Sequence, residues 1–199
     1  MPIIGRTPAD CVNTFRRHVA QPVSKTITTR FPVRVIEREP RMIMSLTDGA
    51  APLPLDTNVG RVFFSLGQAL EAVREDDGTF RLRTLEYWYR LQETADPKGH
   101  AFLRWEYVRP RSVAIAGPPR HHLHARAAVP VAAENLDLNK VHVPTGWVTI
   151  EEVIRFLIHE LGVKPPCGKS WPTVLAESED AFYERFTGKR YTPPRPRRR

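Results

Sequence analysis

Residues 80–108 read FRLRTLEYWYRLQETADPKGHAFLRWEYV, and this stretch decides the fold class of the chain. Aromatic side chains are concentrated near both of its ends, in residues 80–91 and 101–108, as is typical of strands. In a strand every second side chain points to the same face, so the tyrosines of the first segment share one face, with Trp88 opposite. The intervening TADPKG has turn composition, and a connection this short joins antiparallel strands. The stretch therefore predicts an antiparallel hairpin.

Strand patterns continue on both sides of this hairpin. The other predicted strands are two within residues 24–47, broken near Glu39-Pro40, then one at 113–116 and one at 121–131. Residues 50–60, which contain two prolines, are expected to form a loop. Because parallel crossovers need longer connections, we expect an antiparallel meander.

Helical spacing of apolar residues predicts the elements around the sheet. The clearest helix follows Thr149, which forms a capping box with Glu152 and precedes apolar residues at helical spacing up to Leu161. The other predicted helices are residues 8–20, 65–75 and 178–186. We therefore expect a single α+β domain, residues 1–188, with a central antiparallel sheet flanked by helices.

Positive charge is concentrated at the end of the chain. The 199 residues carry a net charge of +8, and residues 189–199 contain six basic and no acidic side chains. The other 188 residues hold 24 basic and 22 acidic side chains, so the body is nearly neutral. The tail is rich in proline and arginine and poor in apolar residues, so we expect residues 189–199 to be disordered.

Composition and missing motifs argue against several classes of function. The chain has no apolar signal region and no apolar stretch of about 18 residues, which predicts a cytoplasmic protein that does not enter a membrane. Cys11 and Cys167 lack metal or redox spacing. Phosphate-loop, dinucleotide-binding and serine-hydrolase motifs are missing, and no cofactor is expected.

A histidine cluster, RHHLHAR at residues 120–126, supplies the candidate catalytic residues. In an extended segment His122, His124 and Arg126 share one face. Cleavage of RNA without a metal needs a base, an acid and positive charge for the developing phosphorane, and this face offers all three. Two alternatives stay open: a structural strand without chemistry, and a metal site. In the second case further ligands would come from His100, Glu106, Glu134 or His142.

Arginines beside aromatic residues predict contact with nucleic acid, because bases stack on aromatic rings while arginines bind the backbone. The candidate binding residues are Arg90, Arg104, Arg109, Arg120, Arg195, Arg197, Arg198 and Arg199. The alternative is that Tyr87, Tyr89, Trp105 and Tyr107 are core and only the arginines reach water. The basic tail is also compatible with an acidic partner or a solubilising end.

Three short motifs and a helix resemble the TumE-type toxins of bacterial toxin–antitoxin modules. The motifs are EYWYR at 86–90, FLRWEY at 102–107 and PPRHHLH at 118–124, and the helix spans 149–161. The family has a similar proline–histidine–histidine–x–histidine run after paired aromatic strands. The resemblance covers about residues 80–161. It implies a small α+β toxin with nuclease-like activity and an antitoxin protein as partner.

The leading expectation is thus a cytoplasmic RNA-acting toxin, a metal-independent endoribonuclease that a protein partner neutralises. The first alternative is a non-enzymatic nucleic-acid-binding or assembly protein in which the histidines are structural. The second alternative is a metal-dependent hydrolase. The sequence leaves a homo-oligomer open.

Overall fold

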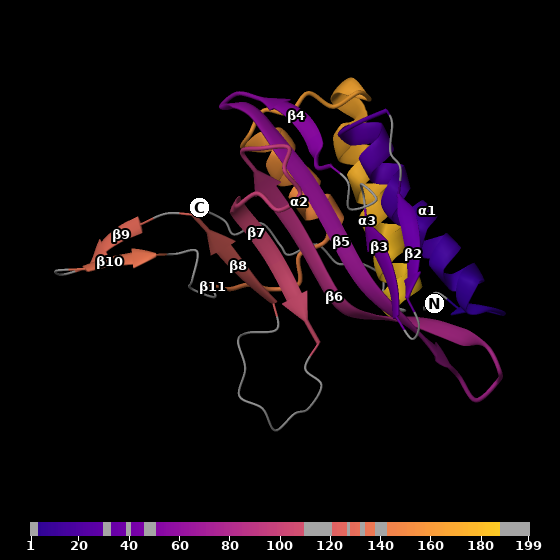
Figure 1. Ribbon diagram of the computed structural model, residues 1–199. Helices are drawn as coiled ribbons and strands as arrows, with labels where there is room; N and C mark the ends of the chain where they lie inside the picture. Colours follow the sequence, from indigo (N-terminus) through magenta and orange to yellow (C-terminus); the bar gives the residue numbers. More distant parts are fainter. Residues whose placement is uncertain are drawn as a thin grey trace, which may run out of the picture.

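Nine strands within the described part of the chain form one antiparallel sheet (Figure 1). The computed structural model describes residues 4–29, 33–38, 41–45, 51–109, 121–126, 128–131, 134–137 and 143–187. The strands are β1 (Ile4–Gly5), β2 (Arg34–Arg38), β3 (Arg41–Ser45), β4 (Leu53–Thr57), β5 (Gly60–Arg74), β6 (Phe80–Gln92), β7 (Ala101–Val108), β8 (His121–Ala125), β9 (Ala128–Val131), β10 (Glu134–Asp137) and β11 (Val143–Pro144). The helices are α1 (Pro8–Thr26), α2 (Ile150–His159) and α3 (Trp171–Thr187).

The strand order is β11-β8-β7-β6-β5-β3-β2, with β1 beside β6 and β4 beside β5. The strands β6, β7 and β8 are consecutive antiparallel neighbours, so the antiparallel arrangement predicted for them is confirmed, and β5 joins them beside β6. The hairpin predicted from residues 80–108 is confirmed as β6 and β7. The two strands expected on either side of Glu39-Pro40 are β2 and β3. Together with the helices, these strands make an α+β domain, as the sequence predicts.

The helix predicted for residues 65–75 is wrong, because this segment belongs to β5. Leu66, Ala69, Leu70 and Val73 have helical spacing in the sequence. The strand is instead bonded to β6 along one edge and to β3 and β4 along the other. Every residue from Phe64 to Leu70 is buried, and Gln68 on the core face and Ala69 on the outer face interrupt the alternation of apolar and polar residues.

Two further expectations about strands need correction. The loop expected at residues 50–60 contains β4, which pairs with β5 through residues 53–57. The single strand expected at 121–131 is two strands, because β8 joins the large sheet while β9 pairs with β10 in a separate two-stranded sheet. The strand expected at 113–116 and the tail from residue 188 lie outside the described residues.

The three described α-helices are close to the expected ones, but two of them have different bounds. A capping box between Thr7 and Asp10 starts α1, which continues past its expected end at residue 20 as far as Thr26. The predicted capping box of Thr149 and Glu152 starts α2, and Gly162 follows that helix with a φ of 69°. The last helix, α3, begins at Trp171 rather than near residue 178.

One face of the sheet packs against the helices and forms the core. Its buried residues include Leu66, Tyr87, Tyr89 and Leu91 from the strands, which meet the apolar faces of α1, α2 and α3. The opposite face is called the outer face here; in the register of the strands it carries Gly67, Trp88, Glu106 and His122 in one row. None of the helices within the described residues is both long and apolar enough to cross a membrane.

Candidate functional site

Pairing of β7 with β8 brings the histidine cluster against the central hairpin on the outer face. Glu106 is directly opposite His122, and Arg104 is directly opposite His124. On its other edge β7 pairs with β6, which places Trp88 beside Glu106 and Arg90 beside Arg104. Two adjacent rows of cross-strand neighbours thus place all the charged and imidazole groups of the site on one face.

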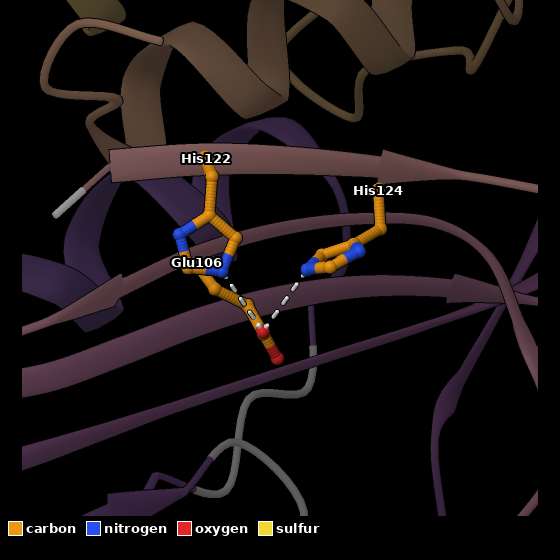
Figure 2. A group of neighbouring side chains, drawn as sticks. All are labelled: Glu106, His122 and His124. Atoms are coloured by element: carbon orange, nitrogen blue, oxygen red, sulfur yellow. Dashed lines mark ion pairs between the residues drawn. The ribbon is translucent and has the colours of Figure 1, made fainter. Parts of the chain in front are cut away.

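The side chains of Glu106, His122 and His124, called the Glu106 cluster below, point toward one another (Figure 2). The Nε2 atoms of His122 and His124 lie 3.5 Å and 3.7 Å from the same carboxylate oxygen, Oε2 of Glu106. These distances exceed the range of about 2.7–3.2 Å for an N–H···O hydrogen bond. The two imidazole rings are 5.0 Å apart and nearly perpendicular.

Two arginines approach the other oxygen of the same carboxylate. Nε of Arg104 lies 3.1 Å from Oε1 of Glu106, and Nη2 of Arg90 lies 3.9 Å from it. The guanidinium of Arg90 also stacks on Trp88, with Cζ 4.5 Å from the ring centroid. Trp88 in turn covers Gly67, where a Cβ atom would overlap the indole ring. Glycine at position 67 therefore lets the tryptophan lie flat enough to support Arg90.

The site is shielded from solvent to different degrees. His122 and His124 are only 3% and 4% exposed, whereas the Glu106 side chain is 20% exposed. Burial lowers the pKa of Arg90, and the nearby Arg104 lowers it further, although an arginine stays protonated at neutral pH. The Nε groups of both arginines are buried, and neither makes a well-oriented hydrogen bond within the described residues. The two side chains are about one third exposed, at 33% and 29%, so the outer parts of their guanidinium groups can reach an anionic ligand.

The structure brings together some of the predicted site residues and separates others. His122, His124, Arg90 and Arg104 meet at Glu106, which the sequence offered only as an alternative metal ligand. The Arg126 side chain lies apart from them, since it is exposed and pairs with Glu93 at 3.2 Å.

The other predicted residues are distributed as follows. Arg109 is exposed, and its Nε donates to the carbonyl oxygen of Thr84 at 2.9 Å. His100 is exposed in the turn between β6 and β7. Outside the residues whose side chains are described lie Arg120, Glu134, His142, Arg195, Arg197, Arg198 and Arg199.

The tyrosines of the hairpin belong to the core, as the alternative interpretation held. Tyr87, Tyr89 and Tyr107 are buried on the helix side of the sheet. The hydroxyl of Tyr87 lies 2.9 Å from Nδ1 of His121, and burial raises the pKa of Tyr87 to about 12. These three rings therefore offer no surface to a nucleic-acid base, and Trp88 is the aromatic residue beside the Glu106 cluster.

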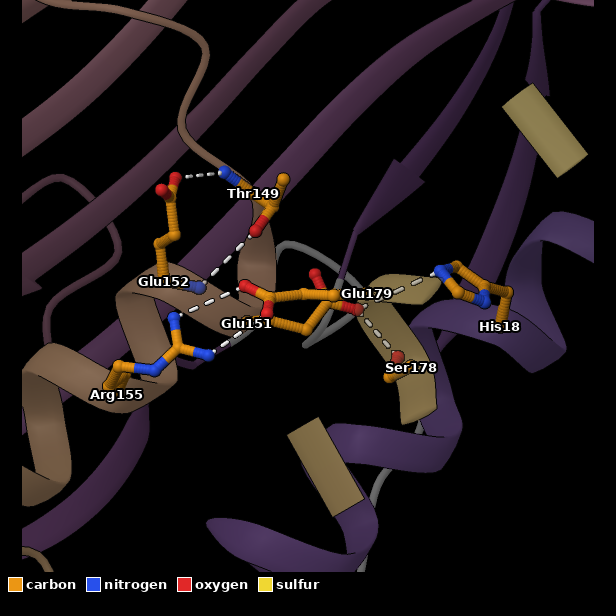
Figure 3. Close-up of polar contacts among 7 residues, drawn as sticks. All are labelled: His18, Thr149, Glu151, Glu152, Arg155, Ser178 and Glu179. Carbon is orange, nitrogen blue, oxygen red and sulfur yellow. Dashed lines mark hydrogen bonds and ion pairs between the residues drawn. The ribbon is translucent and has the colours of Figure 1, made fainter. Parts of the chain in front are cut away.

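A second polar group, which the sequence did not reveal, lies between the helices (Figure 3). We call His18, Glu151 and Ser178 the Glu151 cluster. Ser178 donates a hydrogen bond of 2.5 Å to Oε1 of Glu151, and Nε2 of His18 lies 3.7 Å from the same oxygen. A cavity of about 20 Å³ next to His18 and Glu151 has room for roughly one water molecule.

Burial raises the pKa of the fully shielded Glu151, and the nearby Glu179 raises it further, against the hydrogen bonds from Ser178 and Thr149. Glu179 forms a two-pronged ion pair with Arg155 at 3.1 Å and 3.0 Å. The carboxyl of Glu151 stands between the histidine and the serine, so His18 and Ser178 are not paired as the base and nucleophile of a catalytic triad are. This cluster is a connection between the three helices.

No protein-family model, no curated protein and no solved structure matches this chain.

Proposed function

We propose that this protein acts on RNA at the outer face of its sheet, as a toxin-like endoribonuclease. The observation that carries the proposal is the pair of partly exposed guanidinium groups, on Arg90 and Arg104, next to the Glu106 cluster. Guanidinium groups bind phosphate oxygens well because their donors match the geometry of the anion. A phosphodiester is thus the ligand class that best fits these residues.

Phosphate bound by the two arginines would place its charge beside the imidazoles. In RNA cleavage the 2′-hydroxyl loses its proton and its oxygen forms a bond to phosphorus. The bond to the 5′-oxygen breaks, that oxygen takes up a proton, and negative charge grows on the other phosphate oxygens in between. Fixed positive groups stabilise that charge in the transition state. Arg90, held by its stack on Trp88, and Arg104 are placed on neighbouring strands to do this.

The sequence predicts that His122 and His124 act as general acid and general base, and their geometry bears on this role. An acid and a base that act on opposite sides of a phosphate must flank it. Here both Nε2 atoms face the same oxygen of Glu106. The histidines are therefore better described as a joint group with Glu106 than as a separated acid–base pair.

The protein partner is part of the proposal because the resemblance to toxin–antitoxin modules implies an antitoxin. Expression of the chain alone should then arrest growth, and co-expression of the neighbouring reading frame should restore it. Growth that is normal without any partner, with full-length protein present in the cells, would argue against a toxin.

The test of RNA cleavage compares arginine variants of the purified protein. Arg104→Gln and Arg90→Gln should lower the cleavage rate of a single-stranded RNA by about 10²–10³-fold, the effect of removing one group that stabilises charge in the transition state. The matched control is Arg61→Gln, since Arg61 is exposed and pairs only with Asp56 among the described residues. Thermal unfolding should show that all three variants fold. Equal rates for the site variants and the control would overturn the proposed site.

A second candidate function is supported by the burial of both histidines at 3–4% exposure. Imidazoles this well shielded suit a structural role in a protein that binds nucleic acid without cleaving it. In that case labelled RNA would bind with a strong dependence on salt, because phosphate contacts release counterions. The RNA would remain intact after prolonged incubation.

A further inference from the structure

The spacing of the Glu106 cluster fits a metal ion better than it fits hydrogen bonds. Zinc binds histidine nitrogen at about 2.0–2.1 Å and carboxylate oxygen at about 2.0–2.2 Å. Two ligand atoms at a tetrahedral zinc are therefore about 3.4 Å apart. The two distances from Glu106 to the histidines are 3.5 Å and 3.7 Å, and the three ligand atoms all lie within 4.8 Å of one another.

The orientation of the three groups adds to the argument. Each histidine presents Nε2, a usual metal-binding nitrogen, toward one point, and the carboxylate presents Oε2 toward the same point (Figure 2). Because His122 and His124 lie two positions apart on one strand, both reach the same side of the sheet. Glu106 completes the set from the neighbouring strand, so the backbone pairing itself holds the ligands in place.

We propose that Glu106, His122 and His124 bind one divalent transition-metal ion of the zinc type. Two nitrogens and one oxygen form the ligand set found in zinc hydrolases that keep a further position open for water or substrate. The sequence offers His100, Glu106, Glu134 and His142 as further ligands for a metal site at the two histidines. Of these four, the structure places Glu106 beside the histidines.

The arginines explain why only one carboxylate oxygen would bind the ion. Arg104 and Arg90 approach Oε1, which leaves Oε2 directed at the histidines. Ligating carboxylates generally receive such contacts on their second oxygen, which fix their orientation. The same two cations would disfavour a bare metal ion and favour an anion beside it.

The inference rests on the proposed function for its substrate, since a phosphate oxygen would occupy the open position of the ion. As a Lewis acid the ion would stabilise charge on that oxygen, in addition to the two guanidinium groups. The metal itself is inferred from Glu106, His122 and His124 alone.

The test measures zinc binding to the full chain by titration calorimetry, after treatment with a chelator and removal of it. The wild-type protein should bind one zinc ion per chain. Glu106→Gln, which keeps the shape of the side chain, and His122→Ala should each weaken binding by at least about 100-fold, since even changes next to a ligand have effects of about 10–100-fold. The control is His100→Ala, because His100 is exposed in a turn away from the cluster.

Binding of cobalt(II) can be measured on the wild-type protein, so this test does not depend on whether a variant folds. Cobalt bound by the cluster should show visible absorption bands of a low-coordinate nitrogen–oxygen site, and added zinc should remove them. Wild-type protein that binds no zinc, or site variants that bind it as tightly as the His100→Ala control, would overturn the inference.

RNA cleavage, measured in the same preparations, separates this inference from the proposed function. Cleavage that persists in excess chelator, together with no zinc binding, would remove the metal and leave the RNA function standing. One bound zinc ion without cleavage of RNA would leave the metal site and remove the RNA function.

Discussion

Two glutamates on opposite sides of the same sheet lie in contrasting surroundings. Glu106, on the outer face, is 20% exposed and stands among two arginines and two histidines. Glu151, between the helices, is fully buried, receives a hydrogen bond from Ser178 and has a second carboxylate, Glu179, nearby. Both residues belong to polar clusters that include histidine.

The difference shows that the surroundings of a glutamate decide whether its carboxyl is open to a ligand or serves only to join elements of the fold. The carboxylate of Glu106 lies on a partly exposed face between two guanidinium groups and two imidazoles, where an ion can reach it. Burial and a neighbouring carboxylate disfavour the charge on Glu151, so that its pKa is raised. Glu106 is suited to chemistry, whereas Glu151 is suited to joining α1, α2 and α3.

The largest difference between the two glutamates should appear in activity. Glu106→Gln should reduce RNA cleavage by at least about 100-fold, because it removes a charged ligand of the proposed centre. Glu151→Gln should leave the rate within a factor of about two, since the residue lies on the other side of the sheet, away from the phosphate site. Cleavage rates and melting curves of both variants decide the matter. Equal losses in both would show that the comparison is wrong.

Removal of an arginine close to the Glu151 cluster should lower the stability of the protein more than removal of one close to Glu106. Arg155→Ala leaves the buried carboxylate of Glu179 without its two-pronged partner, and about 2 kcal/mol of unfolding free energy should be lost. Arg104→Ala should cost less than about 1 kcal/mol, because Glu106 is partly exposed and keeps other positive neighbours.

Urea unfolding of these two arginine variants is the measurement. In a Glu151→Gln background the effect of Arg155→Ala should be smaller, since the unpaired Glu179 is then relieved of the repulsion from Glu151. A larger loss for Arg104→Ala than for Arg155→Ala would reverse the assignment of structural and chemical roles.

A change below Trp88 should disturb the outer face alone. Gly67→Ala places a Cβ atom in the indole ring of Trp88, so the ring must move and Arg90 loses its stacked support. We expect about 1–2 kcal/mol of lost stability and weaker RNA binding. Gly146→Ala is the control, because a Cβ at that exposed position meets nothing within 4 Å. Unchanged RNA binding by Gly67→Ala would separate Trp88 from the site.

The smallest effect should be a change of protein stability with pH that is caused by the titration of Glu151. A carboxyl whose pKa is higher in the folded than in the unfolded chain stabilises the fold at acidic pH, and this contribution is lost as the pH rises through the folded value. The melting temperature of Glu151→Gln relative to the wild type should therefore increase from acidic to neutral pH.

Other titrating or charged groups face Glu151 and must be considered in that experiment. They are His18 from α1, Glu152 and Arg155 from α2, Glu179 from α3, and Tyr87 and Tyr89 from the sheet. The same comparison in a His18→Gln background removes the nearest of them. A difference between wild type and Glu151→Gln that is constant with pH in both backgrounds would contradict the raised pKa.

The parts of the fold that the sequence predicted are those with strong local signals. The turn after Gln92 and the alternation of Tyr87, Trp88 and Tyr89 were sufficient to predict β6 and β7, and the capping box at Thr149 predicted α2. The strand β5 was misassigned because Gln68 and Ala69 interrupt its alternation and leave apolar residues at helical spacing. Its real partners, β3, β4 and β6, are specified by tertiary contacts.

The site was partly predictable for the same physical reason. The shared face of His122 and His124 follows from the period of a strand. Their meeting with Glu106 depends on the register between β7 and β8, which no local pattern determines. Arg126 follows the end of β8 and pairs with Glu93 instead. The residues of the Glu151 cluster come from three different helices, so no local sequence motif predicts the cluster.

The alternation of β8 has a consequence for how such a chain can evolve. The strand directs His122 and His124 to the outer face, while His121 stacks on Tyr107 in the core at 4.6 Å. Substitutions can therefore alter one face at a time, but an inserted or deleted residue within the strand would exchange the two faces at once. Among descendants of this sequence we expect changes of length to accumulate outside residues 121–125, however freely the side chains around them vary.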